Sequence, residues 1–194
     1  MLKVGITGGI GSGKTTVCKL FEILGIPVYY ADDEAKKILN SNNKVKESVL
    51  KIFGSSVLDT DGIIDRKKLA ALVFNKKEAL EKLNAVIHPA VGLHFDNWVN
   101  QQNAPYCIKE AAILFESGAY KQVDKVIVVI APLELKMSRT LKRDGISEEE
   151  AKARIKNQLS DEEKVKRSDF TIVNDEQELL IPQVLELHYK LVNK

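Results

Sequence analysis

Gly8-Gly9-Ile10-Gly11-Ser12-Gly13-Lys14-Thr15 is the stretch of sequence that decides the fold, because it matches the phosphate-loop pattern G-x-x-x-x-G-K-[ST]. An apolar run over residues 2–7 precedes it, and residues 14–24 carry apolar side chains at helical spacing. The pattern therefore lies between a predicted strand and a predicted helix, which is the context that a phosphate loop requires. The plain alternative, a tight glycine turn with a surface lysine, does not explain this context.

The chemistry of this loop follows from its residue types. Glycines let the backbone wrap with its N–H groups pointing inward, where they and the positive end of the following helix bind phosphate oxygens. Lys14 can then reach the β- and γ-phosphates, and Thr15 offers a hydroxyl to Mg²⁺. The sequence therefore predicts phosphoryl transfer or hydrolysis of a nucleoside triphosphate.

The rest of the chain indicates an α/β fold. Residues 34–102 show a helical pattern, interrupted by a turn at Asp59-Thr60-Asp61-Gly62, and a closing helix is predicted over 176–192. Four further apolar runs predict strands, over residues 28–30, 106–114, 123–131 and 170–173. With the first strand they predict a five-stranded parallel sheet flanked by helices, with one mostly helical insertion.

Composition restricts the partners and the compartment. The 194 residues are 44% hydrophobic, and 29 Lys and Arg against 27 Asp and Glu leave a formal charge of only +2, which argues against nucleic acid and membrane partners. Cys18 and Cys107 lie far apart without metal-ligand spacing, so neither a disulfide framework nor a zinc site is expected. We find no signal sequence and no membrane-spanning run, and we expect a cytoplasmic protein.

Asp32 is the first candidate on the side of the phosphate acceptor. It follows the predicted strand 28–30, and ligands gather at the carboxyl ends of parallel strands. Its carboxylate could there accept a proton from a substrate hydroxyl. On spacing alone, Asp32 or Asp33 as the N-cap of a helix over 34–40 is nearly as good an interpretation.

Three more charged side chains are candidates for the phosphate side of the site. Glu110 lies in an apolar run, where an acid has to meet a cation, so it either contacts Mg²⁺ or its waters or pairs with a neighbouring lysine. Arg139 and Arg143, in R-x-x-x-R-D, share one helical face and could converge on a polyphosphate. Two solvated surface arginines are the alternative for that pair.

These motifs, taken in this order, resemble the dephospho-coenzyme A kinase family over nearly the whole chain. The combination of the TGGIGSGK loop with the Ala-Asp and Arg-Asp elements is specific to that family among phosphate-loop kinases. The resembling segments are Thr7–Thr16, Leu24–Ile26, Ala31-Asp32, His88-Pro89, Ile113–Glu116, Arg139–Asp144, Gln158, Ser168-Asp169 and Asn174.

The resemblance implies an activity and a set of site residues. The activity is transfer of phosphate from ATP, with Mg²⁺, to the ribose 3′-hydroxyl of dephospho-coenzyme A, the last step of coenzyme A synthesis. Asp32 would take the proton of that hydroxyl, and Arg139 and Arg143 would be lid arginines that contact phosphate, so that with Lys14 they form the catalytic set. The implied nucleotide-binding residues are Gly11, Ser12, Gly13, Lys14, Thr15, Thr16 and Asn174, the last of them near the adenine.

The resemblance also implies a division of the chain. Residues 1–33 and 103–194 would form the nucleotide-binding core, 34–102 a helical acceptor domain, and 138–165 a mobile lid within the core segment. Residues 36–82 hold eleven Lys and Arg and six Asp and Glu, a local charge of +5 that suits an acceptor with several phosphates.

Arg66 and His88 are candidates for binding the acceptor in this helical region. A surface arginine at a helix start is the alternative for Arg66. His88-Pro89 could be merely structural, because proline frees a carbonyl group that the histidine can satisfy.

We expect a small-molecule acceptor as the partner, and a monomer or a weak homo-oligomer. Two other functions stay open: a nucleoside or nucleotide kinase with a different acceptor, and a non-catalytic nucleotide-binding module. The [NT]KxD tetrad of GTPases is missing after an apolar strand, and Asp32 stands where a kinase needs a base, so both features argue against a switch-type module.

Overall fold

The computed structural model describes residues 1–73 and 76–193, and the chain divides into two compact units. The first, here called the α/β unit, comprises Met1–Tyr30 and Gln101–Lys194. The second, here called the helical unit, comprises Ala31–Asn100.

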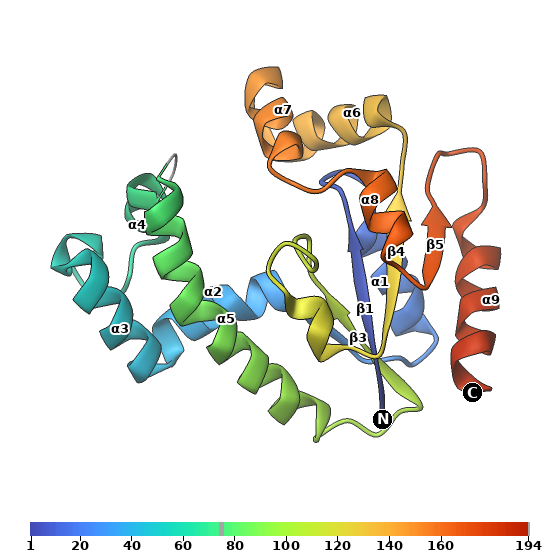
Figure 1. The fold of residues 1–194 in the computed structure, drawn as a ribbon, viewed down its shortest axis with the longest axis horizontal. Helices are drawn as coiled ribbons and strands as arrows, with labels where there is room; N and C mark the ends of the chain where they lie inside the picture. The colour runs from blue at the N-terminus through green and yellow to red at the C-terminus, as the bar shows by residue number, and fades with distance from the viewer. Residues whose placement is uncertain (74–75, 194) are drawn as a thin grey trace. The chain divides into compact units, whose positions relative to one another are not determined.

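A five-stranded parallel sheet forms the centre of the α/β unit, as predicted (Figure 1). Its strand order is β2-β3-β1-β4-β5, so β1, which leads into the phosphate loop, lies in the middle. The strands are β1 (Leu2–Gly8), β2 (Val28–Tyr30), β3 (Tyr106–Glu110), β4 (Lys125–Ile130) and β5 (Phe170–Val173).

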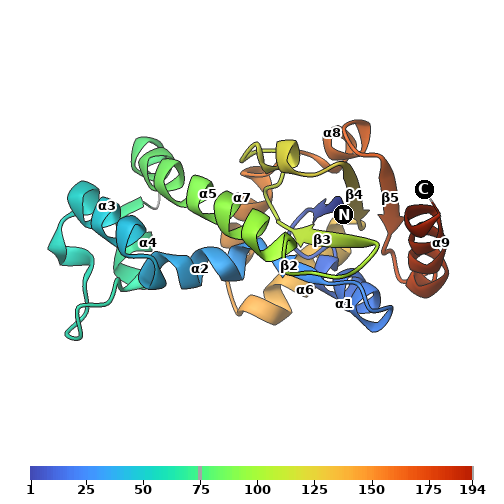
Figure 2. The ribbon, with the colours of Figure 1, turned by 90° about the horizontal axis from the view of Figure 1, so that it is seen from below.

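Alternation along β1 explains how the two faces of the sheet are covered. Val4 and Ile6 are fully buried on the face that α1 and α9 cover, in one apolar cluster with side chains of those helices. Gly5 points to the other face, where the side chain of Leu114 packs directly over it. In Figure 2, α1 and α8 lie on opposite sides of the strands. A sheet covered on both faces explains why its strands are continuous apolar runs.

Two helices of the α/β unit, α7 and α8, begin at side-chain caps. Ser147 and Glu150 form a capping box at the start of α7, and the Ser160 hydroxyl accepts the Glu163 N–H at the start of α8. The helical elements are α1 (Lys14–Ile23), the 3₁₀ turn η2 (Ala119–Gln122), α6 (Leu133–Asp144), α7 (Glu148–Lys156), α8 (Asp161–Lys166) and α9 (Leu180–Val192).

The helical unit confirms the helical pattern predicted for residues 34–102, of which 74–75 lie outside the described residues. The predicted turn is also present, because the Asp59 carbonyl accepts the Gly62 N–H at 3.2 Å. Helices α2 and α3 meet at Asn42, whose side chain accepts the Val45 N–H at 3.2 Å and caps α3. The elements are α2 (Ala31–Ser41), α3 (Asn43–Phe53), the 3₁₀ turn η1 (Ser55–Val57), α4 (Arg66–Val73) and α5 (Lys77–Val99).

Several predicted elements were longer than those observed. The strand predicted over 123–131 spans only Lys125–Ile130. The strand predicted over 106–114 ends at Glu110, after which the chain turns. The closing helix begins at Leu180 and not at residue 176, because the Asp175 carboxylate accepts the Gln177 and Glu178 N–H groups and holds a turn there. A side chain that accepts backbone N–H groups in this way competes with helix formation, and the spacing of apolar residues does not reveal that competition.

Within the described ranges, no helix has both the length and the apolar character needed to cross a bilayer.

Candidate active site

The phosphate loop connects β1 to α1 at the middle of the sheet. Lys14 is the first residue of α1, and its ammonium folds back over the loop, donating to the carbonyl groups of Gly8 and Gly9 at 3.0 and 3.3 Å. Lys14 is buried, with only 8% of its surface exposed. The loop thus holds a cation at its centre, where an anionic phosphate group would bind.

Two glycines of the loop are required by its surroundings. Gly11 and Gly13 have φ angles of 77° and 93°, which L side chains rarely adopt. A Cβ on Gly13 would overlap the Asn174 Nδ2 atom, and one on Gly11 would overlap the Lys136 carbonyl oxygen. The backbone of the loop therefore packs directly against α6 and against Asn174, the residue that follows β5.

Asn174 and Arg139 are brought to the loop from distant parts of the chain. The Asn174 amide donates to the Ser12 carbonyl at 2.7 Å. The Arg139 guanidinium donates to the carbonyl groups of Gly11 and Asn174 at 3.4 and 3.2 Å, and to the Glu176 carboxylate at 2.8 Å. Two residues that the sequence predicted for the nucleotide site therefore contact the phosphate loop directly.

Arg143 has a different environment from Arg139, although both lie on α6. Its guanidinium donates to the neighbouring Asp144 carboxylate at 2.7 and 3.1 Å, and Asp144 also accepts from Arg154 at 3.1 Å. The hydrogen bond from Arg143, with the charges of both arginines, holds the pKa of Asp144 below its usual value. Arg143 is mostly exposed, so this structure places it in a surface ion-pair cluster.

Thr15, Thr16 and Glu110 are the oxygen-bearing candidates on the loop side of the sheet. The two threonines follow Lys14 in the first turn of α1 and are exposed. Glu110 ends β3, where it is 8% exposed and pairs in register with Ile6 of β1 and Tyr30 of β2. Glu110 thus lies at the carboxyl end of the strands, the same end at which β1 continues into the phosphate loop.

The environment of Cys18 places Glu110 and Lys14 near the same part of α1. Burial raises the pKa of the Cys18 thiol, the charges of Glu110 and Glu22 raise it further, and the charge of Lys14 opposes them. A hydroxyl at Thr15 and a carboxylate at Glu110 are the hard oxygen donors that Mg²⁺ prefers, so the residues present fit this ion.

Asp32, Arg66 and His88 belong to the helical unit. The structure confirms that Asp32 follows strand β2, which ends at Tyr30, but corrects the N-cap alternative: α2 begins at Ala31, so Asp32 lies inside its first turn and is not an N-cap. The same holds for Asp33, whose carboxylate accepts from Lys36 at 2.6 Å.

Arg66 is exposed at the first position of α4, which begins where the Asp65 carboxylate accepts the Lys67 and Lys68 N–H groups. His88 and Pro89 lie inside α5, which continues through the proline to Val99.

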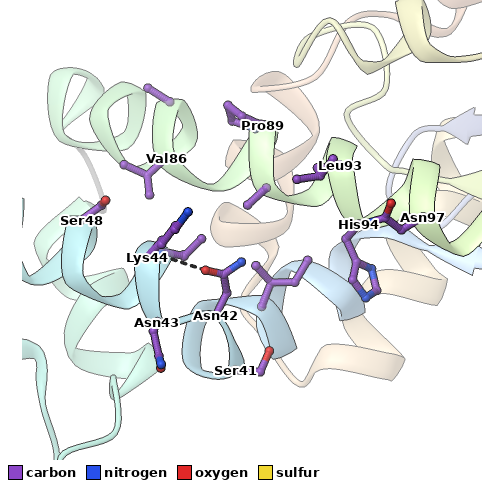
Figure 3. A pocket seen from close by; sticks show the side chains of 14 residues that line it. Ser41, Asn42, Asn43, Lys44, Ser48, Val86, Pro89, Leu93, His94 and Asn97 are labelled. Atoms are coloured by element: carbon purple, nitrogen blue, oxygen red, sulfur yellow. Dashed lines mark hydrogen bonds between the residues drawn. The ribbon is translucent and has the colours of Figure 1, made fainter.

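A groove within the helical unit lies between α5 and the junction of α2 and α3. It has a volume of about 930 Å³ and is lined by apolar side chains such as Ile38 and Leu93, together with carboxamide, imidazole and ammonium groups. Figure 3 shows Leu93 and His94 on α5, with Asn42 and Lys44 on the other side of the groove. Its size and mixed lining are those of sites that bind small molecules.

Sequence reasoning gave no role to several polar residues that contact the loop or hold the segment that contacts it. Lys136 precedes Arg139 by three positions, so helical spacing on α6 could have indicated it. Gln158 and Glu116 fall in segments that carried the family resemblance, which was the available signal for them. Asp161 and Lys164 lie in a densely charged segment typical of a solvent-exposed surface, and nothing in the sequence distinguished them from their neighbours.

The parallel sheet with a phosphate loop after its central strand, and with an arginine and an asparagine bound to that loop, defines a protein of the P-loop kinase fold. Solved structures bear this out. A protein from Thermus thermophilus is 36% identical with a TM-score of 0.84, and covers 99% of this chain and 96% of its own. The dephospho-CoA kinase of Campylobacter jejuni is 33% identical with a TM-score of 0.71, over 98% and 97% of the two chains.

The sequence comparisons identify the family. The family model for dephospho-CoA kinase matches residues 2–179. The dephospho-CoA kinase of Bacteroides fragilis is 41% identical over 187 residues, 96% of this chain and 91% of its own. That of Fusobacterium nucleatum is 44% identical over 172 residues, 89% of each chain. The chain belongs to the dephospho-CoA kinase family.

Proposed function

We propose that this protein transfers the γ-phosphoryl group of ATP to the ribose 3′-hydroxyl of dephospho-CoA and releases CoA and ADP. The observation that carries the proposal is the assembled phosphate loop, with Lys14 folded over it and Arg139 and Asn174 bound to it, in a chain of this family. We place the reaction at the end of CoA biosynthesis, in the cytoplasm.

The nucleotide side of the reaction is assigned to the α/β unit. The loop N–H groups from Gly11 to Thr16 and the Lys14 ammonium hold the β- and γ-phosphates, and Asn174 and Arg139 lie on the nucleotide side of the loop. Arg143 has to leave Asp144 to reach a phosphate, and such a movement agrees with the proposed lid over residues 138–165. Mg²⁺, when bound, neutralises phosphate charge, and Thr15 with Glu110 would hold it directly or through water.

The acceptor side is assigned to the helical unit. Asp32 accepts the proton of the ribose 3′-hydroxyl. At the same time the 3′-oxygen bonds to the γ-phosphorus, and the bond between the γ-phosphorus and the oxygen that leaves with ADP breaks. Arg66 and His88 are proposed to contact the acceptor. An open groove with carboxamides and an ammonium group in the same unit supports this assignment, because the acceptor carries amides and phosphates.

An acceptor panel tests this function. With Mg²⁺ and ATP, we expect the purified protein to form ADP and CoA in equal amounts from dephospho-CoA, which a coupled assay and mass spectrometry of the product measure. Nucleosides and nucleoside monophosphates at the same concentration serve as competing acceptors. A faster turnover of any of these would contradict the assignment, and so would the absence of CoA at high enzyme concentration.

A further inference from the structure

The segment that joins α7 to α8 reaches back to the phosphate loop. The Ile10 N–H, in the first half of the loop, donates to the Gln158 side-chain oxygen at 2.9 Å. The two residues are 148 positions apart. A backbone donor of the loop is therefore satisfied by a side chain just beyond α7, within the proposed lid.

An ion pair lies against the loop next to this hydrogen bond. Lys136 of α6 donates to the Asp161 carboxylate at 2.7 Å, and the two side chains are only 9% and 19% exposed. A Cβ built on Gly9 would lie 3.3 Å from Lys136 Nζ and 3.3 Å from Asp161 Oδ1. The pair thus packs on the loop backbone one residue before Ile10, where glycine leaves room for it.

A second ion pair holds the same segment from the other side. Glu116 accepts the Leu159 N–H at 2.9 Å, and the same carboxylate oxygen lies 3.4 Å from the ammonium of Lys164. Lys164 is fully buried on α8. The carboxylate therefore fixes the backbone next to Gln158 and also balances a buried charge, which is expensive to leave without a counterion.

We propose that Gln158 is a positioning residue for nucleotide binding, which holds the first half of the phosphate loop through Ile10, and that the Lys136–Asp161 and Glu116–Lys164 pairs keep Gln158 in place. With its N–H paired, the loop is ordered before the nucleotide arrives, and ATP binding does not have to order it. Because Gln158 lies in the proposed lid, a movement of that segment would be transmitted to the loop. The inference rests on the proposed function only in taking ATP as the nucleotide.

Gln158→Leu in the full-length protein tests the proposal, because leucine fills similar space but cannot accept a hydrogen bond. We expect the dissociation constant for a non-hydrolysable ATP analogue, measured by titration without acceptor, to rise about tenfold, the scale of leaving a partly buried backbone donor unpaired. The KM for ATP should rise in parallel, and the KM for dephospho-CoA should stay within about twofold. Gln101→Leu is the matched control, since Gln101 is exposed in the same unit and we expect it to bind the analogue as the wild type does.

A second variant guards against an uninformative loss of folding. The double substitution of Glu116→Gln with Lys164→Met removes the charge pair but keeps an oxygen for the Leu159 N–H, and we expect about threefold weaker binding of the analogue. If either folded variant has a lower melting temperature but wild-type affinity for the analogue, its contact is only structural and the proposal is overturned.

The binding measurement also separates this inference from the proposed function. If the wild type does not phosphorylate dephospho-CoA but Gln158→Leu still weakens binding of the analogue, the function is wrong and the positioning role stands. If the wild type is active and Gln158→Leu binds the analogue normally, the function stands and the positioning role is wrong.

Discussion

The α/β unit and the helical unit are built in different ways. In the α/β unit, all five residues of β3 are buried, and the phosphate loop is bound by side chains from α6, from the segment after α7 and from the end of β5. In the helical unit, α4 buries only Leu69, and an open groove lies between α5 and the junction of α2 and α3. The phosphate loop is thus held by side chains that lie far from it in the sequence, whereas the helical unit carries an open groove.

The largest effect should come from the helical unit, at Asp32. We expect Asp32→Asn to lower kcat by about 10²–10⁴-fold, because the amide cannot take the proton of the acceptor hydroxyl. Affinity for ATP should be unchanged, since the groups that we propose to bind it lie in the other unit. Steady-state kinetics and titration with an ATP analogue measure the two quantities.

Asp33→Asn is the matched control for this substitution. Asp33 is the next residue on α2, is exposed and pairs with Lys36, so kcat should stay within about twofold of the wild type. Equal losses in the two variants, or an active Asp32→Asn protein, would remove Asp32 from the role of base.

Two glycine substitutions, one in each unit, should have smaller effects than Asp32→Asn. Gly13 and Gly62 have φ angles of 93° and 71°, so alanine at either site costs about 1–2 kcal/mol in backbone strain. Around Gly62 a Cβ meets open space, whereas at Gly13 it overlaps Asn174. We expect Gly62→Ala to lose only that stability, and Gly13→Ala to bind ATP more than tenfold more weakly as well.

Denaturant unfolding and analogue titration measure both glycine variants. Equal affinity for ATP in the two would show that the contact between the loop and Asn174 has no part in binding.

The smallest effect concerns pH and the buried Lys164. Burial lowers the pKa of its ammonium, and the charges of Glu116 and Asp161 only partly oppose this, while Lys136 adds to it. Between that lowered pKa and the usual value of about 10.4, the unfolded state binds more protons than the folded state, so stability contributed by this group rises with pH.

The wild type should therefore gain free energy of unfolding relative to Lys164→Met as the pH rises from 8 to 10, by less than about 1.4 kcal/mol per pH unit. Urea titrations at several pH values measure this difference. A constant difference across the range would mean that Lys164 keeps its ordinary pKa in the folded protein.

Arg139 and Arg143 show how far sequence reasoning reaches into the site. Their spacing correctly placed both on α6, but it treated them alike. In the structure, Arg139 contacts the loop and Asn174, whereas Arg143 pairs with its neighbour Asp144. Helical periodicity predicts which side chains lie on the same face of a helix. Only the packing of other elements against that face determines what each side chain contacts.

The sequence by itself determined the phosphate loop, the five parallel strands and the helical insertion, because these depend on local residue types and on apolar periodicity. It also carried the family resemblance that the comparisons confirmed. Only the tertiary structure decided which side chains hold the loop. Gln158 and Ile10 are separated by 148 positions, and no local pattern encodes that meeting, because the order of strands in the sheet brings the two segments together.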